Sequence, residues 1–404
     1  MPDRPSPEDL DEFLTRGVAD VFVRADLERL LRSGERRLRI KQGFDPTRPN
    51  LHIGHSVPLR KLRTLARWGH EIVIIVGDWT TQIGDPTDKD ESRPMMTHEQ
   101  VLENAKTYLD QFHLMVPREN TRIVYQSEWF TRFGLREVIE LASRFTAQQL
   151  LAREEFRKRQ AAGTPIPVKD LLYPLLQAYD SVAIEADVEV GGTDQQFNVL
   201  GGRQLQEKVG QRPQNVLLTQ LLEGLDGAQM SKSKPDTAIW LLDPPGEMYG
   251  KVMAIHDDLM PHYFEWATDL PLAEVRQLLG ALERRELHPR DAKERLARQI
   301  VTELHSADAA EAAAGAFRKT FREGARPADS RALSAAPSGD PAIERVLVHL
   351  GIAKSLGEAR RWVSQGGVRV NDVKVAPATP VEMDGDTFIQ VGPLRSWRVT
   401  WTVT

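Results

Sequence analysis

The sequence predicts an α/β domain with a doubly wound parallel sheet, followed by an all-α segment and a small α+β domain. Strand and helix patterns alternate through about residue 230, whereas residues 245–325 show helix patterns almost alone. Residues 341–404 combine two short helices with strands. The chain of 404 residues also exceeds the usual ~100–200 residues of one domain, so two or three domains are expected.

Three segments of the first domain have strand character. Residues 38–45 (LRIKQGFD) alternate in polarity and end in a turn at Gly43. Residues 71–80 (EIVIIVGDWT) contain a continuous apolar run, which is typical of a strand buried on both faces of a parallel sheet. Residues 121–127 (TRIVYQS) are the third predicted strand.

Helices are predicted between these strands. Residues 55–69 (HSVPLRKLRTLARWG) have apolar side chains at helical spacing, and Gly69 is the predicted C-terminal stop. Residues 97–112 (THEQVLENAKTYLDQF) form a second helix with Thr97 as its N-cap. The repeated strand–helix order indicates a Rossmann-type arrangement.

The rest of the chain changes character twice. Amphipathic helices are predicted within 245–325, and the stretch 326–340 is rich in Ala, Pro, Ser and Gly, which predicts a linker. The predicted domains are therefore 1–230, 231–325 and 341–404, with the linker between the last two.

Composition excludes several classes of protein. The sequence lacks a run of ~18 apolar residues, so no transmembrane helix is expected, and the acidic, polar N-terminus does not resemble a signal peptide. The absence of cysteine excludes disulfides and thiolate chemistry and suits a reducing cytoplasm. The net charge is −5, so nucleic-acid binding would require a local basic surface.

The first candidate site is the sequence NLHIGH at residues 50–55, which follows the first predicted strand. Ligands of open parallel sheets bind at the carboxyl ends of strands, and a helix N-terminus there suits phosphate. His52 and His55 lie one helical turn apart and could both donate to one polyphosphate, while Gly54 leaves room for a flat ring. Ordinary helix-start residues, or half of a zinc site, are the alternatives; without cysteine or a nearby third ligand, a metal site is disfavoured.

The second candidate is the Gly-rich, polar stretch GLDGAQMSKSKPD at residues 224–236. Lys232 lies between Ser231 and Ser233, and such a loop can bring a lysine onto a leaving pyrophosphate. Taken alone, such a stretch is more commonly a solvated basic turn.

Together, these two stretches resemble the HIGH and KMSKS signatures of class I aminoacyl-tRNA synthetases. The stretches GFDPT, GDWTTQIGDP, LLYPLLQAYDS and VGGTDQQFN further resemble the amino-acid pocket of bacterial tyrosyl-tRNA synthetases, in the branch with a segment like RPMMTHEQVLENAKTYLDQ. The resemblance runs from about residue 5 to 404. It implies a catalytic domain at 1–230, a KMSKS-type loop and helical anticodon-region domain at 231–325, and an RNA-binding domain of the ribosomal-protein type at 341–404.

The resemblance implies a tyrosine site. Asp180 would bind the phenol hydroxyl, and a site of this kind rejects phenylalanine because its own buried polar group would be left unpaired. Asp85, Tyr173 and Gln177 would hold the ammonium group, and Gln195 would lie near the carboxylate. Tyr173, Gln177 and Asp180 also share one helical face by their spacing. The alternatives are a core position for Tyr173 with solvated Gln177 and Asp180, or acid–base catalysis by Asp85 and Asp180.

The resemblance also implies an ATP site and a closing loop. The catalytic residues would be His52, His55, Thr47 and Lys232. Nucleotide contacts would come from Asp45, Thr47, His52, Gly54, His55, Gly192, Asp194, Met230, Ser231, Lys232 and Ser233. Lys89 and Arg93 match a mobile loop that closes over pyrophosphate, although a run of mixed charges is more often solvated surface.

Two positions depart from the family pattern. The first lysine of KMSKS is replaced by Gln229, so Lys232 is expected to supply more of the positive charge, together with Lys234. Lys41 stands where some members have a tyrosine that also binds the substrate hydroxyl.

The C-terminal domain carries a local basic surface. Lys and Arg outnumber Asp and Glu over residues 341–404, although the whole chain is acidic. The predicted RNA contacts are Lys354, Arg360, Arg361, Arg369 and Lys374, which suit phosphate contacts that position RNA without reading bases. A solvated charged helix is the alternative.

The resemblance thus predicts a cytoplasmic tyrosine–tRNA ligase that uses ATP with Mg²⁺, has no protein-bound metal site, binds L-tyrosine and tRNA(Tyr), works as a homodimer and does not enter a membrane. Three other functions compete. A tryptophanyl enzyme shares both signatures but has no use for a phenol-binding Asp180. A non-catalytic RNA-binding descendant has no use for His52, His55 and Lys232. A small nucleotidyltransferase has no reason for the C-terminal domain.

Overall fold

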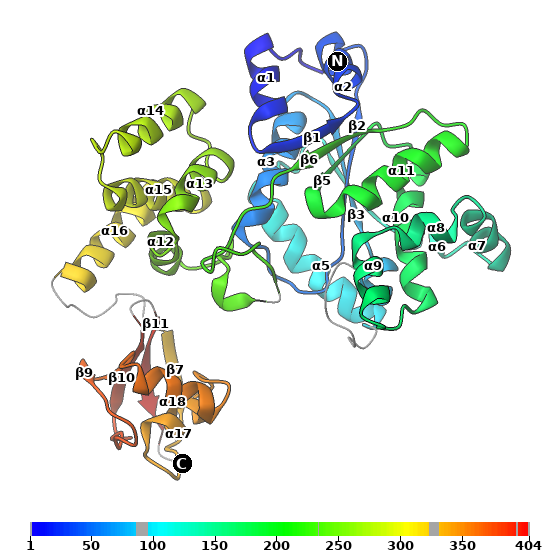
Figure 1. Ribbon diagram of the computed structural model, residues 1–404. Helices are drawn as coiled ribbons and strands as arrows, with labels where there is room; N and C mark the ends of the chain where they lie inside the picture. Colours follow the sequence, from blue (N-terminus) through cyan, green and yellow to red (C-terminus); the bar gives the residue numbers. More distant parts are fainter. Residues whose placement is uncertain (1, 86–95, 233, 323–330, 393–394, 403–404) are drawn as a thin grey trace. The chain divides into compact units, whose positions relative to one another are not determined.

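The computed structural model describes residues 2–85, 96–232, 234–322, 331–392 and 395–402 (Figure 1). The chain divides into two compact units. The first contains 1–242 and 261–270, and the second contains 243–260 and 271–404. In the described part of the chain, no helix has the length and apolar character needed to cross a membrane.

The first unit is built on a sheet with the strand order β1-β6-β5-β2-β3-β4. Its strands are β1 (Val18–Phe22), β2 (Arg39–Phe44), β3 (Glu71–Val76), β4 (Thr121–Tyr125), β5 (Val188–Gly192) and β6 (Asn215–Thr219). All neighbours are parallel except β1, which joins the edge antiparallel to β6. The predicted parallel sheet is thus confirmed, but three of its strands were not predicted: the parallel strands β5 and β6 and the antiparallel edge strand β1.

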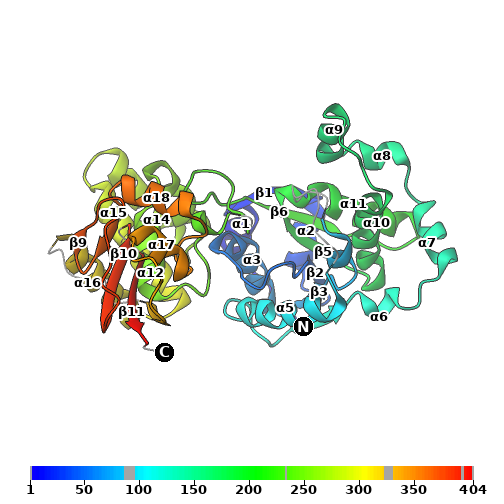
Figure 2. The same ribbon diagram turned by 90° about the horizontal axis from the view of Figure 1, so that it is seen from below.

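Helices cover both faces of this sheet, as Figures 1 and 2 show. Helices α3 (Ser56–Arg67) and α5 (His98–Phe112) lie on one face, and α10 (Val168–Ala183) and α11 (Gln196–Lys208) lie on the other. Strand β3 is buried along nearly its whole length, which explains its continuous apolar sequence. Helix α5 begins with a capping box between Thr97 and Gln100, as the sequence predicted for Thr97.

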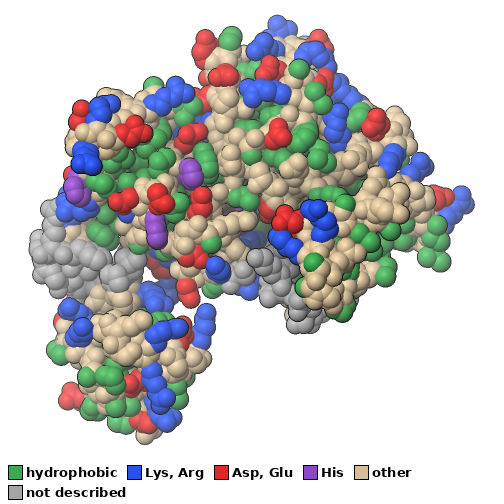
Figure 3. Space-filling model, viewed as in Figure 1, with side chains coloured by type: hydrophobic (Ala, Val, Ile, Leu, Met, Phe, Trp, Pro, Cys, Tyr) green, Lys and Arg blue, Asp and Glu red, His purple; other side chains and the backbone are tan. Residues whose placement is uncertain are grey.

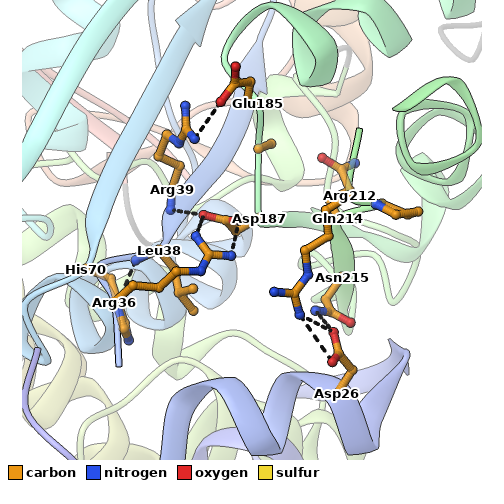
Figure 4. Close-up of polar contacts among 12 residues, drawn as sticks. Asp26, Arg36, Leu38, Arg39, His70, Glu185, Asp187, Arg212, Gln214 and Asn215 are labelled. Atoms are coloured by element: carbon orange, nitrogen blue, oxygen red, sulfur yellow. Dashed lines mark hydrogen bonds and ion pairs between the residues drawn. The ribbon is translucent and has the colours of Figure 1, made fainter. Parts of the chain in front are cut away.

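An ion pair between Arg36 and Asp187 lies at the end of the sheet where β2 and β5 begin (Figure 4). Arg36 donates to both carboxylate oxygens of Asp187, at 2.9 and 2.6 Å. The Asp187 carboxylate also accepts the backbone N–H of Arg39. These contacts tie the first residues of the two strands together, at the end opposite their carboxyl termini.

The second unit starts with helices, as predicted for 245–325. They are α12 (Pro245–Met253), α14 (Leu272–Glu283), α15 (Pro289–Leu304) and α16 (Ala307–Arg322). The predicted boundary at residue 231 does not match the compact units, because 231–242 and 261–270 belong to the first unit. Part of helix α13 (Met260–Trp266) therefore packs with the sheet domain, where Arg16 donates to the carbonyl of Glu265.

The C-terminal part contains helices α17 (Ile343–His349) and α18 (Leu356–Ser364) and a second sheet with the order β7-β11-β10-β8-β9. Its strands are β7 (Arg331–Ala335), β8 (Val368–Val370), β9 (Val373–Lys374), β10 (Asp386–Val391) and β11 (Arg395–Trp401). The predicted linker is wrong in part, since β7 lies within it and pairs in parallel with β11. Leu333 and Ala335 of β7 pack against the core of this domain, so one face of β7 is partly buried.

Candidate active site

A cavity of about 320 Å³ opens at the carboxyl ends of β2 and β5. These strands are neighbours, but the helices that follow them, α3 and α11, cover opposite faces of the sheet. The cavity therefore lies at the point where the strand order reverses, which is where open α/β sheets bind ligands. It is lined by the predicted residues Asp45, Thr47, His52, Gly54, His55, Asp85, Tyr173, Gln177, Asp180, Gly192, Asp194, Gln195, Met230, Ser231 and Lys232. Ser233, Lys89 and Arg93 lie outside the described residues.

The two histidines flank a short turn, η1 (Ile53–His55), that leads into α3. Their ring centroids are 3.9 Å apart, and Nδ1 of His55 lies 3.2 Å from the backbone nitrogen of His52. Nδ1 of His55 also lies 3.2 Å from the carbonyl oxygen of His52, to which it can donate. In the tautomer in which Nδ1 instead accepts the N–H, the ring proton of His55 resides on Nε2 and is available as a donor. A Cβ atom on Gly54 would lie 2.9 Å from Nδ1 of His52, so glycine is required for this close approach.

Burial keeps both imidazoles neutral. It lowers the pKa of His52 to about 3, with a further contribution from the charge of Lys232. Burial also lowers the pKa of His55 well below its usual value, and His52 and Lys232 add to this effect. At neutral pH, the pair therefore offers N–H donors without adding positive charge to the site.

The loop after β6 brings Lys232 to the same cavity. Met230 anchors the loop, since its side chain is buried and its N–H donates to the carbonyl of Leu222. Nζ of Lys232 lies 5.0 Å from the ring centroid of Tyr108, over the face of an aromatic side chain that also lines the cavity. The expectation that Lys234 assists Lys232 is not supported, because its Nζ pairs with Asp226 at 2.9 Å and the residue does not line the cavity.

Arg48 is a cation of this site that sequence reasoning missed. Its side chain lines the cavity, and Nη1 donates to the carbonyl of Lys232 at 2.8 Å. The signal was its place between the end of β2 and the histidine pair, in the segment from which the predicted phosphate contacts come.

Asp180 forms the buried polar end of the cavity. Its carboxylate accepts hydrogen bonds from Nε2 of Gln126 at 2.8 Å and from Nε1 of Trp129 at 3.2 Å. Burial raises the pKa of Asp180 to about 7, against the opposing influence of Lys41 and these two donors. Sequence reasoning missed both Gln126 and Trp129, whose only signal was their place directly after strand β4.

Tyr173, Gln177 and Asp180 share the face of α10 that borders the cavity, which confirms their predicted common face. The hydroxyl of Tyr173 donates to Oδ2 of Asp45 at 2.9 Å. Burial, together with the charges of Asp45 and Asp85, raises the pKa of Tyr173 well above its usual value, so it stays a neutral donor.

A second polar cluster surrounds Asp85. Its carboxylate accepts from Nη2 of Arg153 at 3.2 Å and from Nε2 of Gln195 at 3.1 Å. Asn198 in turn donates to Oε1 of Gln195 at 2.9 Å, which orients that amide. Sequence reasoning missed both Arg153 and Asn198: Arg153 comes from a distant segment, whereas Asn198 follows Gln195 by three residues at the start of α11.

The end of β5 supplies the remaining predicted contacts. A Cβ atom on Gly192 would lie 2.5 Å from Oδ1 of Asp194 and 2.8 Å from Cδ2 of Leu221, so a larger residue would displace one or both side chains. Burial raises the pKa of Asp194, with a contribution from the charge of Asp85. Within the described residues, no group of three or more His, Cys, Asp or Glu side chains is arranged to hold a metal ion.

The predicted RNA contacts lie in the C-terminal domain, over which Lys and Arg side chains are visible in Figure 3. Arg360 and Arg361 of α18 border a surface hollow of about 500 Å³, together with Arg345, which the sequence analysis did not select. Lys354 precedes this helix, and Arg369 and Lys374 lie on β8 and β9. Arg395, also not selected, lies over the ring of Trp362.

Comparisons with known proteins agree with this architecture. Residues 33–322 match the family model "tRNA synthetases class I (W and Y)", and residues 343–388 match the S4 domain model. A tyrosine–tRNA ligase of Dehalococcoides mccartyi is 46% identical over 387 residues, covering 96% of this chain and 97% of the relative. A tyrosine–tRNA ligase of Thermotoga maritima is 42% identical and covers 98% of both chains.

A solved structure shares the fold at lower identity. The tyrosyl-tRNA synthetase of Archaeoglobus fulgidus, complexed with L-tyrosine, has a TM-score of 0.60 at 22% identity. The match covers 76% of this chain and 99% of that chain.

Proposed function

Because this chain belongs to the tyrosine–tRNA ligase family of the class I aminoacyl-tRNA synthetases, we propose that its cavity joins L-tyrosine to ATP and then transfers the tyrosyl group to tRNA(Tyr). One observation carries the proposal. A neutral histidine pair, the ammonium of Lys232 and the buried carboxyl of Asp180 border one cavity at the switch point of the sheet. This arrangement supports phosphate contacts at one end and recognition of a hydroxyl at the other.

The phosphate end would act mainly by electrostatic stabilisation. In the first step, a carboxylate oxygen of L-tyrosine attacks the α-phosphorus of ATP, and the bond to pyrophosphate breaks. His52, His55, Thr47 and Lys232 would donate to the phosphate oxygens as negative charge develops, and Arg48 lies close enough to join them. Mg²⁺ would arrive with ATP and neutralise part of the phosphate charge. Lys89, Arg93 and Ser233 remain proposed pyrophosphate or nucleotide contacts.

The nucleoside of ATP and L-tyrosine would contact the other residues that line the cavity. Asp45 would lie beside the α-phosphate, and Gly192 and Asp194 would bind the ribose. Asp85, Tyr173 and Gln177 would hold the ammonium of L-tyrosine, where a carboxylate is the expected partner. Gln195 would lie near the substrate carboxylate, and Asp180 would accept the phenol O–H. The remaining proposed nucleotide contacts are Gly54, Met230 and Ser231. In the second step, a hydroxyl of the terminal ribose of tRNA attacks the tyrosyl carbonyl, and AMP leaves.

Exchange of labelled pyrophosphate into ATP tests this proposal. Exchange that depends on tyrosine, with a far lower kcat/KM for phenylalanine and none with tryptophan, is the expected result. Tryptophan-dependent exchange would instead support the related tryptophanyl activity, and the absence of exchange with any amino acid would support a non-catalytic RNA-binding role.

The carboxyl of Asp180 predicts a pH dependence of tyrosine binding. Its pKa of about 7 in the free protein means that the ionised fraction grows as the pH rises through neutrality. Because the ionised form is the better acceptor for a phenol O–H, we expect the KM for tyrosine to fall between pH 6 and pH 8, while the KM for ATP changes little. Steady-state exchange kinetics over this range measure both values. A tyrosine KM that rises across the range would contradict the assigned role of Asp180.

The C-terminal domain is proposed to bind tRNA through phosphate contacts of Lys354, Arg360, Arg361, Arg369 and Lys374, with α14–α16 of the helical part near the anticodon. The family match to an S4 domain and the basic side chains around α18 support this role. Because β7 belongs to the same sheet, a clean deletion must begin before residue 331.

We expect deletion of residues 323–404 to leave tyrosine-dependent pyrophosphate exchange within about twofold and to reduce tRNA charging by ~10-fold or more, since several phosphate contacts are lost together. Parallel exchange and aminoacylation assays compare the two activities. Equal loss of both would contradict a role confined to tRNA. A shorter deletion of 341–404 removes the domain but leaves β7 without its partner strand β11. Comparing the two deletions separates the effect of losing the domain from the effect of exposing the edge of β7.

A homodimer formed through the catalytic domain is part of the proposal. Helix α7 (Leu135–Ala142) exposes Leu135 and Ile139, one turn apart, and Val168 at the start of α10 is also exposed. Exposed apolar side chains at helical spacing are typical of a surface that another chain covers. We propose a cytoplasmic location because the cysteine-free sequence suits a reducing compartment that contains ATP and tRNA.

A further inference from the structure

Lys41 is a fully buried lysine directly beneath the proposed tyrosine site. Its Nζ lies 2.8 Å from Oε1 of Glu189, 2.8 Å from Oγ of Ser181 and 3.1 Å from the carbonyl oxygen of Gln177. An ammonium group has three N–H donors, and these three acceptors account for all of them. Lys41 therefore does not replace the tyrosine that contacts the substrate hydroxyl in other members.

The partner carboxylate belongs to the adjacent strand. Glu189 on β5 is the register partner of Lys41 on β2, so the ion pair crosses the two strands at the switch point. Glu189 also accepts from Oγ of Ser181 at 3.2 Å and from the amide of Gln214. The side chains of both Lys41 and Glu189 are almost completely inaccessible to solvent.

Both charged side chains are connected to the part of α10 that carries Asp180. Ser181 follows Asp180 directly, and Gln177 precedes it by one helical turn. The ammonium of Lys41 donates to Gln177 and to Ser181, so it connects strand β2 to the turn of α10 that carries Asp180. A movement of Lys41 or Glu189 would shift the turn and displace the carboxylate of Asp180 from the cavity.

We propose that Lys41 and Glu189 are a positioning pair that sets the selectivity for tyrosine over phenylalanine by fixing the place of Asp180. This inference rests on the proposed tyrosine ligase function. A buried ion pair is a weak stabilising device, because apolar side chains of similar volume stabilise a core equally well. The ion pair fixes the relative positions of its two side chains by directed contacts, which two apolar side chains would not do. A site that recognises one hydroxyl depends on placement within fractions of an ångström.

The two charges of the ion pair also affect the pKa of Asp180. The charged groups that face Asp180 are Lys41 from β2 and Glu189 from β5, and its hydrogen-bond donors are Gln126 and Trp129. Lys41 lowers the pKa of Asp180, whereas Glu189 raises it. Loss of the lysine charge should therefore leave more of Asp180 protonated at neutral pH.

The test compares Lys41→Met and Ser181→Ala with the unchanged protein in pyrophosphate exchange. For Lys41→Met, the ratio of kcat/KM for tyrosine to that for phenylalanine should fall ~10-fold or more, while the KM for ATP stays within about twofold. Its KM for tyrosine should improve between pH 7 and pH 9 more steeply than that of the unchanged protein, because the pKa of Asp180 has risen. Ser181→Ala keeps both charges and should lower the same ratio ~3-fold.

Arg36→Met is the matched control, since Arg36 and Asp187 pair just before the first residues of the same two strands and do not line the cavity (Figure 4). This variant should retain both the tyrosine/phenylalanine ratio and its pH dependence. An unaltered ratio in folded Lys41→Met, or an equal loss in Arg36→Met, would overturn the inference. If Lys41→Met does not fold, Ser181→Ala decides through the same ratio. Absence of tyrosine-dependent exchange in the unchanged protein would instead refute the proposed function.

Discussion

Replacing His55 with alanine is expected to slow tyrosyl-adenylate formation by ~10²–10³-fold and to leave the affinity for L-tyrosine within about twofold. His55 is buried and neutral, and its ring lies at the N-terminal end of α3, beside His52 and near Lys232. A donor in this place contributes most when negative charge develops on the phosphates, so its loss acts on the chemical step. In the proposed mode, tyrosine binds next to Asp180 and not at the histidine pair, so its affinity should be little affected.

Single-turnover measurement of adenylate formation, together with equilibrium binding of tyrosine, separates these two effects. His113→Ala is a suitable control, because His113 ends α5 and does not line the cavity. A variant whose tyrosine affinity collapses while the rate of the chemical step holds would show that the roles of the two ends of the cavity are wrongly assigned.

Asp180→Asn is expected to lower kcat/KM for tyrosine by ~10–100-fold while that for phenylalanine changes little, so that selectivity is largely lost. Gln126 and Trp129 both donate to the carboxylate of Asp180. An asparagine amide has only one oxygen, so one of these donors would face an NH₂ group, and the phenol would lose its charged acceptor.

Competition between tyrosine and phenylalanine in the exchange reaction measures this selectivity. Asp170→Asn on the same helix is the matched control, because Asp170 is also buried, pairs with Arg159 and does not line the cavity. Full retention of selectivity in Asp180→Asn would remove the carboxylate from the recognition of the hydroxyl, and a similar loss in Asp170→Asn would indicate a general disturbance of α10.

Local sequence patterns located β2, β3 and β4 of the first sheet, whereas β1, β5 and β6 were not predicted. The apolar run of β3 and the Thr97 N-cap of α5 depend on residues close in sequence, and both were predicted correctly. Strand β7 was missed because its short, Ala-rich sequence resembles a linker until β11 lies beside it. Strand β1 was missed for a related reason, since its pairing partner β6 lies about 200 residues further along the chain.

The candidate site divides in the same way. The family resemblance predicted that the histidine pair, the Lys232 loop and the polar face of α10 share one site, and the structure brings all three to one cavity. The partners of these residues were not predictable. Gln126 and Trp129 reach Asp180 from the end of β4, and Arg153 reaches Asp85 from a segment about 70 residues away.

The sequence by itself determined the family, the element that carries each motif and the chemistry that each motif can perform. Only the tertiary structure decided which side chains pair with one another and which direction each one takes. Lys41 is an example. From the sequence, it is a cation in place of a hydroxyl-binding tyrosine; in the fold, its ammonium is directed to Glu189 and to α10. The reason is physical: charge state and direction of a side chain depend on burial and on partners, and these come from segments distant in the chain.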